Sequence, residues 1–320
     1  ILVTGAGGFI GGHLVNYLLK KKNYKIVCVD IKPKKNWFQI FDKAINYSLD
    51  LSDYRNCVKI TKNIDYIFNL ACNMGGMGFI ETNKSACMMS VLINTNLLKS
   101  ATINNVQKYF FSSSACVYNS KKQKNLNNPG LKEEDAYPAD PEDGYGWEKL
   151  FSERMCRHFE EDYVIKVRIV RLHNVYGPHG TYLGGREKAP AAICRKIIEA
   201  KLKSKKSISV WGDGKQTRSF MYIDDCIKGI MKIFNGNYSK PINLGSAERV
   251  SINQMIRIIE DIASYKVKKK YLLSKPKGVR GRSSDNKLIK KTLNWEPNIK
   301  LKKGLEKTYH WIYAQLTSNY

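Results

Sequence analysis

The chain has 320 residues, of which 43% are hydrophobic, and it carries a formal net charge of +26 at pH 7. This length allows one large domain or two unequal ones. No apolar run approaches the ~20 residues that a helix needs to span a bilayer, so we expect no membrane partner. The chain starts at Ile1 rather than Met, and we expect residues to be missing before it.

The basic residues are mostly lysines spread over nearly every segment, with no helix-turn-helix, RNP or zinc-finger pattern. We therefore expect no specific nucleic-acid partner, although such a charge attracts anionic substrates. None of the eight cysteines forms a Cys-x-x-Cys pair. This predicts reduced thiols in a cytoplasmic protein and no metal site.

The first half of the chain alternates short apolar runs with helical patterns, which is typical of βαβ units around a parallel sheet. In chain order we predict strands at 1–4, 25–30, 45–48, 65–69, 106–112 and 164–172. The helices predicted between them cover 10–20, 82–104 and 145–160.

The second half has a looser pattern and begins with a Gly/Pro-rich stretch at 177–190. We predict strands at 207–211, 216–223, 241–244 and near 268–272. The predicted helices cover 190–201, a segment from 224, 252–264, 285–293 and 301–316.

A glycine-rich turn lies between the first strand and the first helix. Gly5, Gly8 and Gly11 have the Gly-x-x-Gly-x-x-Gly spacing. Gly5 allows a tight turn, Gly8 allows close approach of a pyrophosphate, and Gly11 allows close contact between helix and strand. Phe9 and Ile10 begin the helix, whose N-terminus faces the phosphates. The turn predicts a dinucleotide site.

An acidic residue follows at the expected distance. Asp30 ends the second strand, where a carboxylate accepts the adenosine ribose hydroxyls and repels a 2′-phosphate. The cofactor is therefore predicted to be NAD. Asp50, Leu70 and Ala71 follow the third and fourth strands, at the sheet edge where ligands bind, and we expect them to contact it.

The fold class predicted from these patterns is α/β. A Rossmann-type, doubly wound parallel sheet is expected over 1–172, with 216–245 returning to it. A smaller mixed α/β substrate domain is expected mainly over 173–320.

Three side chains predict hydride-transfer chemistry. Tyr145 and Lys149 share a helix face at i, i+4, and Ser114 follows the fifth strand at the edge that carries the glycine turn. An ammonium near a phenol lowers its pKa, and a hydroxyl can share its proton. With the glycine turn, this triplet resembles the extended short-chain dehydrogenase/reductase superfamily, in which Tyr145 and Lys149 would also contact NAD.

Longer segments narrow the resemblance. Over essentially the whole chain, and most specifically in Gly-Gly-Arg-Glu-Lys-Ala-Pro, the sequence resembles the GDP-mannose 3,5-epimerase family. The segments that carry the resemblance are 74–79, 113–118, 184–192, 211–218 and 278–285. It implies conversion of GDP-mannose to GDP-L-galactose, with GDP-L-gulose as the C5-only product.

The resemblance also implies an acid/base pair, Cys116 and Lys188. Transient oxidation at C4 acidifies the hydrogens at C3 and C5, and a base and an acid on opposite ring faces can then invert those carbons. We expect Arg186 to lower the pKa of Lys188 by like-charge repulsion.

The substrate contacts are likewise implied by the family. We expect Arg218 and Arg282 to clamp the diphosphate, because a guanidinium matches phosphate oxygens bidentately. The remaining expected contacts are Gly75, Ser114, Ala115, Cys116, Asn174, Glu187, Lys188, Ala189, Lys196, Gln216 and Thr217.

One departure keeps an alternative open. A His after Tyr-Gly-Pro, here His179, resembles GDP-fucose synthase, a 4-keto-6-deoxymannose epimerase/reductase in which this residue would replace Lys188 as the acid. A second alternative is a non-catalytic NAD-sensing or nucleic-acid-binding protein of the same fold. The superfamily resemblance further implies a homodimer formed by the helices at 82–104 and 145–160.

Overall fold

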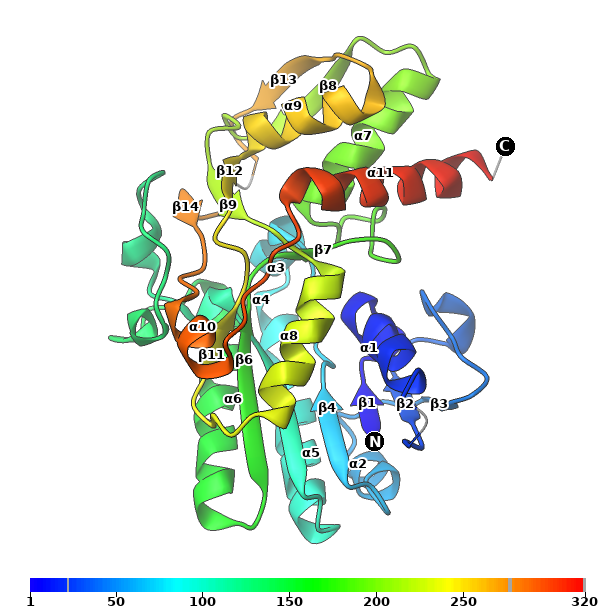
Figure 1. Ribbon diagram of the computed structural model, residues 1–320, viewed down its shortest axis with the longest axis vertical. Helices are drawn as coiled ribbons and strands as arrows, with labels where there is room; N and C mark the ends of the chain where they lie inside the picture. The colour runs from blue at the N-terminus through cyan, green and yellow to red at the C-terminus, as the bar shows by residue number, and fades with distance from the viewer. Residues whose placement is uncertain (22, 276–277, 319–320) are drawn as a thin grey trace.

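A parallel β-sheet of seven strands forms the centre of the computed structural model, which describes residues 1–21, 23–275 and 278–318 (Figure 1). The strand order is β11-β6-β5-β4-β1-β2-β3, and every neighbouring pair is parallel. The strands are β1 (Leu2–Thr4), β2 (Val27–Asp30), β3 (Ile45–Ser48), β4 (Tyr66–Asn69), β5 (Lys108–Ser114), β6 (Lys166–Leu172) and β11 (Ile242–Leu244). The predicted doubly wound α/β fold is confirmed.

The two faces of the sheet are buried under different helices. Side chains alternate across a strand, so Phe110 packs with α1 (Phe9–Leu19) and α8 (Ile223–Asn235), whereas its neighbour Phe111 faces the opposite helices. Those helices are α2 (Tyr54–Ile60), α5 (Ser90–Ile103) and α6 (Asp143–Asp162). Burial on both faces explains why the central strands are apolar runs.

The strand order reverses on either side of β1, which lies between β4 and β2. In open α/β sheets this switch point forms a crevice at the carboxyl ends of the strands. Gly5 follows β1, Asp30 ends β2 and Ser114 ends β5. The topology therefore places these predicted cofactor and catalytic residues at the same edge of the sheet.

A second layer lies beyond that edge, in the upper part of Figure 1. Three helices pack together there: α7 (Ala189–Leu202), α9 (Ile252–Ala263) and α11 (Leu301–Thr317). They carry a two-stranded parallel ribbon of β8 (Ser207–Trp211) and β13 (Lys268–Leu272). A three-stranded sheet in the order β12-β9-β14 lies nearer the central sheet (Figure 1). It is built from β12 (Arg249–Ser251), β9 (Thr217–Ser219) and β14 (Gly281–Arg282).

Two predicted elements are wrong in extent. The single helix predicted at 82–104 is two helices, α4 (Lys84–Met88) and α5, and its first residue, Thr82, ends a third, α3 (Met77–Thr82). The breaks are at Asn83 and Met89. The strand predicted at 216–223 is divided into β9 and β10 (Met221–Tyr222), because β9 pairs with β12 and β14 whereas β10 pairs with β7 (Val175–Tyr176). The remaining helix is α10 (Lys287–Leu293).

Within residues 1–21, 23–275 and 278–318, no helix is both long enough and apolar enough to span a bilayer. The same part of the chain holds no group of three or more His, Cys, Asp or Glu side chains placed for a metal ion.

Candidate active site

The glycine turn has the tight geometry that a dinucleotide cradle requires. Gly5 has a φ of +66°, and a Cβ on Gly11 would lie 2.2 Å from the Gly5 carbonyl oxygen. Gly8 is the N-cap of α1, and no side chain caps its amides. The first turn, which includes Phe9 and Ile10, therefore has no side-chain cap on its amides, an arrangement that suits an anion.

Asp30 lies at the end of β2, 8% exposed. Its carboxylate accepts the backbone N–H of Lys32 at 3.0 Å. The Lys32 ammonium donates to the Gly7 carbonyl at 2.7 Å, so the segment after β2 is tied to the glycine turn. Burial lowers the pKa of Lys32, and the charge of Asp30 opposes that effect.

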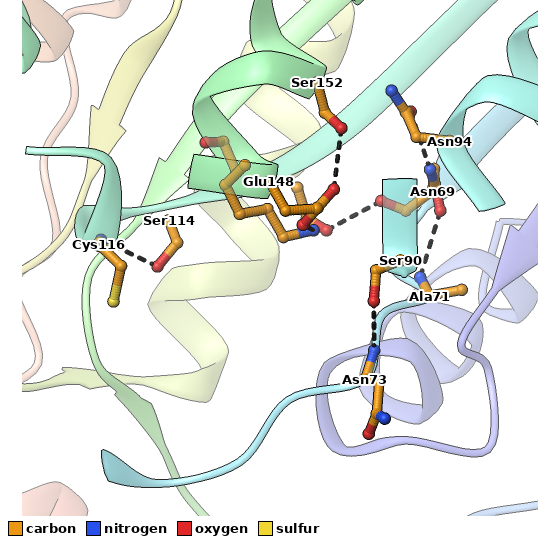
Figure 2. Close-up of polar contacts among 12 residues, drawn as sticks. Asn69, Ala71, Asn73, Ser90, Asn94, Ser114, Cys116, Glu148 and Ser152 are labelled. Atoms are coloured by element: carbon orange, nitrogen blue, oxygen red, sulfur yellow. Dashed lines mark hydrogen bonds and ion pairs between the residues drawn. The ribbon is translucent and has the colours of Figure 1, made fainter. Parts of the chain in front are cut away.

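The loop after β4 is held by a buried polar network (Figure 2). Asn69 donates to Asn94 Oδ1 at 3.2 Å and to the Tyr109 hydroxyl at 2.8 Å, while its Oδ1 lies 3.3 Å from the Ala71 amide. This network fixes Leu70, whose carbonyl would lie 2.8 Å from a Cβ on Gly5. Asn94 and Tyr109 were not predicted, because polar residues inside a helix and a strand carry no motif.

Asp50 differs from the other expected cofactor contacts because it is exposed. Its Oδ1 accepts the backbone N–H and the hydroxyl of Ser52 at 2.8 and 2.7 Å. The carboxylate therefore already has local partners at the start of the loop after β3.

Tyr145 and Lys149 lie on the buried face of α6, 5% and 1% exposed. The Tyr145 hydroxyl hydrogen-bonds Ser114, and the Lys149 ammonium lies 5.7 Å from the centre of the Tyr145 ring. Burial raises the pKa of Tyr145 well above its usual range, and the hydrogen bond with Ser114 opposes this. The structure therefore brings the predicted triplet together.

A buried carboxylate accompanies Lys149. Glu148 is 3% exposed, its Oε1 accepts the Ser152 hydroxyl at 2.8 Å, and its Oε2 lies 3.6 Å from Lys149 Nζ (Figure 2). Burial lowers the pKa of Lys149, but Cys72 and Glu148 together outweigh it, and the net shift is upward. Lys149 is therefore kept as a cation.

Cys116 lies in the short 3-10 turn Ala115–Val117, directly after β5. The Ser114 hydroxyl accepts the Cys116 backbone N–H at 3.2 Å (Figure 2), and Arg282 NH1 donates to Cys116 Sγ at 3.5 Å. A Cβ on Gly146 would lie 2.4 Å from the Cys116 carbonyl oxygen. The helix that carries Tyr145 therefore packs directly on the turn that carries Cys116.

Lys188 is the N-cap residue of α7 and is half-buried. Burial lowers its pKa, while Cys116, Cys226 and Cys72 act in the opposite direction. The Lys188 ammonium is therefore more acidic than that of an exposed lysine, and it lies within electrostatic reach of Cys116.

The expected role of Arg186 in lowering that pKa is wrong, because burial is the effect that lowers it. The Arg186 guanidinium instead donates to Asn73 Oδ1 at 3.0 Å and to the Met74 carbonyl at 3.2 Å. It also lies 3.8 Å from the centre of the Phe79 ring. Arg186 thus joins the loop after β4 to the segment before α7.

His179 lies in a different environment from Lys188. Its φ is +59°, and its ring packs against Trp311 of α11 at 5.2 Å and His13 of α1 at 5.7 Å. Burial lowers its pKa. Among the contacts of the described residues, none joins His179 to Cys116 or Lys188.

Several expected substrate contacts surround the start of α7, whose first residue is Ala189. Gly75 is buried beside Gly76, whose N–H donates to the Arg186 carbonyl at 2.9 Å. Glu187 Oε1 pairs with Arg195 at 3.3 Å, whereas its Oε2 is buried with no partner among the described residues. Lys196 donates to the Ser209 carbonyl at 2.8 Å.

The other expected contacts lie on β9 and β14 and just before them. Arg218 and Arg282 are paired residues in the register of these two parallel strands. Burial, and then the charge of Arg282, lower the pKa of Arg218 to about 10. Gln216 has a buried Oε1 with no partner in the described chain, and Thr217 donates to the Leu126 carbonyl at 2.6 Å.

Asn174 joins the central sheet to this strand, since its Nδ2 donates to the Ser219 carbonyl at 3.2 Å. Arg282 has two further partners that sequence patterns did not indicate. Its Nε donates to Gln123 Oε1 and its NH2 to Glu142 Oε2, each at 2.5 Å. Both partners are more than 130 residues away in sequence, which explains why no local pattern identified them.

These features define a nucleotide-sugar enzyme of the Rossmann type, and comparison with known proteins agrees. The chain belongs to the NAD dependent epimerase/dehydratase family, which matches residues 1–245. NAD is thus the cofactor, and the alternative of a non-catalytic protein is not supported.

Particular relatives are more specific. The chain is 44% identical over 317 residues to GDP-mannose 3,5-epimerase of Arabidopsis thaliana and 45% identical to GDP-mannose 3,5-epimerase 1 of Oryza sativa subsp. indica. Each alignment covers 99% of this chain and 82% of the relative. Among solved structures, UDP-glucuronic acid 4-epimerase from Bacillus cereus, in complex with UDP-glucuronic acid and NAD, has a TM-score of 0.83. Its identity is 27%, and the match covers 98% of this chain and 99% of that one.

Proposed function

We propose that this enzyme epimerises GDP-mannose at C3 and C5 to give GDP-L-galactose, with GDP-L-gulose as the C5-only product. The observation that carries the proposal is that the turn with Cys116 packs directly on the helix with Tyr145, and that Lys188 lies within electrostatic reach of Cys116. A 4-epimerase would need only the hydride-transfer residues. The two plant relatives named above support the same reaction.

The residues at the sheet edge fit NAD. A Cβ on Gly5 or Gly11 would collide with backbone, so the turn is shaped for close approach of a phosphate, and Asp30 is placed for ribose hydroxyls. Asp50, Leu70 and Ala71 would complete the adenosine and pyrophosphate side. NAD held there would supply reversible hydride transfer at C4 of the sugar, with no net oxidation over the catalytic cycle.

Tyr145 would take the proton of the C4 hydroxyl. Its hydrogen bond with Ser114 orients the phenol, and the buried cation of Lys149 stabilises the phenolate that forms. The same Tyr145 returns the proton when the hydroxyl is regenerated.

Cys116 and Lys188 would invert the acidified carbons. One group removes the proton from C3 or C5, and the other delivers a proton to the opposite face of the ring. Burial lowers the pKa of Lys188, which makes its ammonium a better proton donor near neutral pH. The net change is one proton removed and one delivered at each carbon, so the sugar keeps its composition.

The nucleotide would extend toward β9 and β14. Arg218 and Arg282 are the proposed diphosphate ligands, with Asn174, Gln216 and Thr217 beside them and Lys196 on α7. The buried oxygens of Glu187 and Gln216 that have no partner among the described residues are suited to accept hydroxyl or N–H groups of the substrate. Gly75, Ala115 and Ala189 would contact the sugar through their backbone.

The direct test is incubation of the enzyme with GDP-mannose in deuterated water, with products and label positions read by NMR. The expected outcome is deuterium at C3 and C5 of the recovered sugar and none at C4, because the C4 hydride is retained on the enzyme. Label at neither C3 nor C5 would contradict the proposal.

We further propose that the protein is a homodimer. Five large apolar side chains are exposed at the junction of α4 with α5 and on the N-terminal halves of α5 and α6: Met88, Met89, Leu92, Trp147 and Phe151. We call this set the α4–α6 patch. Met88 packs next to Gly144 of α6, so the patch spans adjoining helices. Exposed apolar patches of this kind mark protein–protein contacts.

A cytoplasmic location is the last part of the proposal. All eight cysteines are free thiols. Reduced cysteines in this number are typical of a reducing compartment.

A further inference from the structure

Glu142 lies at a helix N-terminus, but its carboxylate pairs with a distant arginine instead of the helix amides. It is the N-cap residue of α6, but its side chain makes no capping hydrogen bond. Short side chains such as Asp or Ser at this position ordinarily cap the first amides of the helix, and a longer acidic side chain there ordinarily faces the positive end of the helix dipole. The Glu142 carboxylate instead pairs with Arg282 NH2 at 2.5 Å, and both side chains are largely buried.

The guanidinium that Glu142 holds also contacts Cys116. Arg282 is 5% exposed, its Nε donates to Gln123 and its NH1 donates to Cys116 Sγ at 3.5 Å. Glu142 and Cys116 thus share one cation. A cation beside a sulfur favours the thiolate, and a carboxylate on the same cation reduces that effect.

We propose that Glu142 is a positioning residue, which holds the Arg282 guanidinium against Cys116 and offsets part of its charge. It thereby determines how much positive charge faces the Cys116 sulfur. This inference rests on the proposed function, in which Cys116 exchanges protons with the sugar.

The charges around this group come from every element packed on it. Arg218 on β9, Arg280 before β14 and Arg282 itself are cations. The other titratable groups around it include Glu81 on α3, Cys72 after β4, Lys188 at the start of α7, Tyr145 on α6 and His173 after β6. Glu142 is the carboxylate that Arg218 and Arg282 share as a neighbour. Removing its charge therefore leaves a cluster of cations next to the thiol.

The test is Glu142→Gln, which keeps an acceptor oxygen for Arg282 but removes the charge. Alkylation of Cys116 by iodoacetamide is measured against pH in substrate-free enzyme, by mass spectrometry of its peptide. We expect the pH of half-maximal rate to fall by about half to one unit. The acidic limb of the deuterium-exchange rate shifts by the same amount.

Two further variants separate charge from geometry. Glu142→Ala releases Arg282, so exchange falls at least tenfold, and Glu142→Asp restores part of it. Glu161→Gln is the matched control, because Glu161 is exposed at the other end of α6, about 28 Å away along the helix. It should leave the alkylation midpoint unchanged.

An alkylation midpoint that does not move in Glu142→Gln, or that moves equally in Glu161→Gln, overturns the proposal. A purely structural role would lower the exchange rate in the Gln and Ala variants without shifting either pH profile. If the midpoint shifts while the wild-type enzyme incorporates no deuterium, Glu142 is coupled to Cys116 and the proposed reaction is wrong. The two hypotheses are therefore tested independently.

Discussion

Cys116 and Lys188 differ from the many other cysteines and lysines of the chain in their surroundings. Cys116 is fixed by Ser114 and Arg282, and Lys188 is half-buried at a helix start with a lowered pKa. These placements support the proposed proton-transfer roles, since a structural thiol needs no cation and a surface lysine is solvated.

We therefore expect Cys116→Ala to lower deuterium exchange at C3 and C5 by about 10²–10⁴-fold, the usual contribution of a general acid or base. Lys188→Ala should have an effect of similar size. NAD should stay bound in both, because neither residue lies in the glycine turn. Exchange by NMR and bound NAD by absorbance after denaturation check both parts.

His179 provides the control for this pair. It packs between His13 and Trp311, so His179→Phe should change the exchange rate less than about threefold. A loss as large as that of Lys188→Ala would instead make His179 the acid and favour the reaction of GDP-fucose synthase.

At the scale of elements, the chain's local patterns predict the repeating part of the fold well. β3, β8 and β13 have the predicted bounds, because each is an uninterrupted extended run. The helix predicted at 82–104 failed because polarity and helix propensity do not reveal the breaks at Asn83 and Met89. At Asn83 the backbone leaves the helical region, with a φ of −130° and a ψ of 44°.

In the site, too, local patterns predict some residues, whereas others depend on contacts between distant segments. Gly5, Tyr145 and Lys149 could be predicted because their spacing has a local physical meaning. Glu142 and Gln123 could not, since their role depends on Arg282, which is distant in sequence and adjacent only in the folded chain.

The α4–α6 patch gives a prediction at this scale. Trp147 and Phe151 are 46% and 57% exposed and lie one turn apart on α6. Replacing both by Glu should convert a dimer into a monomer, because two charges would be buried in the interface. Sedimentation velocity measures the change, and Tyr163→Glu, at an exposed site after α6, is the matched control. A wild-type monomer at micromolar concentration would refute the dimer.

At the scale of the whole molecule, a buried histidine makes stability depend on pH. His173 is 1% exposed, its Nε2 hydrogen-bonds Asn243 Oδ1 at 2.9 Å, and burial lowers its pKa to about 4. The unfolded chain binds a proton near pH 6.5, so between these values the unfolded state holds more protons than the folded state. Stability contributed by neutral His173 is therefore complete above pH 6.5 and is lost as the pH falls toward 4.

The expected loss from this residue is about 3 kcal/mol between pH 7.5 and 4. Urea unfolding at the two pH values measures it, and His173→Asn should reduce the difference by that amount. The exposed His310→Asn should leave the difference unchanged. An equal acid sensitivity in wild type and His173→Asn would exclude this residue as the cause.

The position of β11 has a consequence for synthesis on the ribosome. This strand pairs with β6, yet some 70 residues separate them, and α8, which covers the same face, also follows late in the chain. A nascent polypeptide that ends after β6 would expose an unpaired strand edge and an uncovered apolar face. Folding of the cofactor half must therefore wait for most of the translated chain, which makes the partly synthesised enzyme a natural client for chaperones.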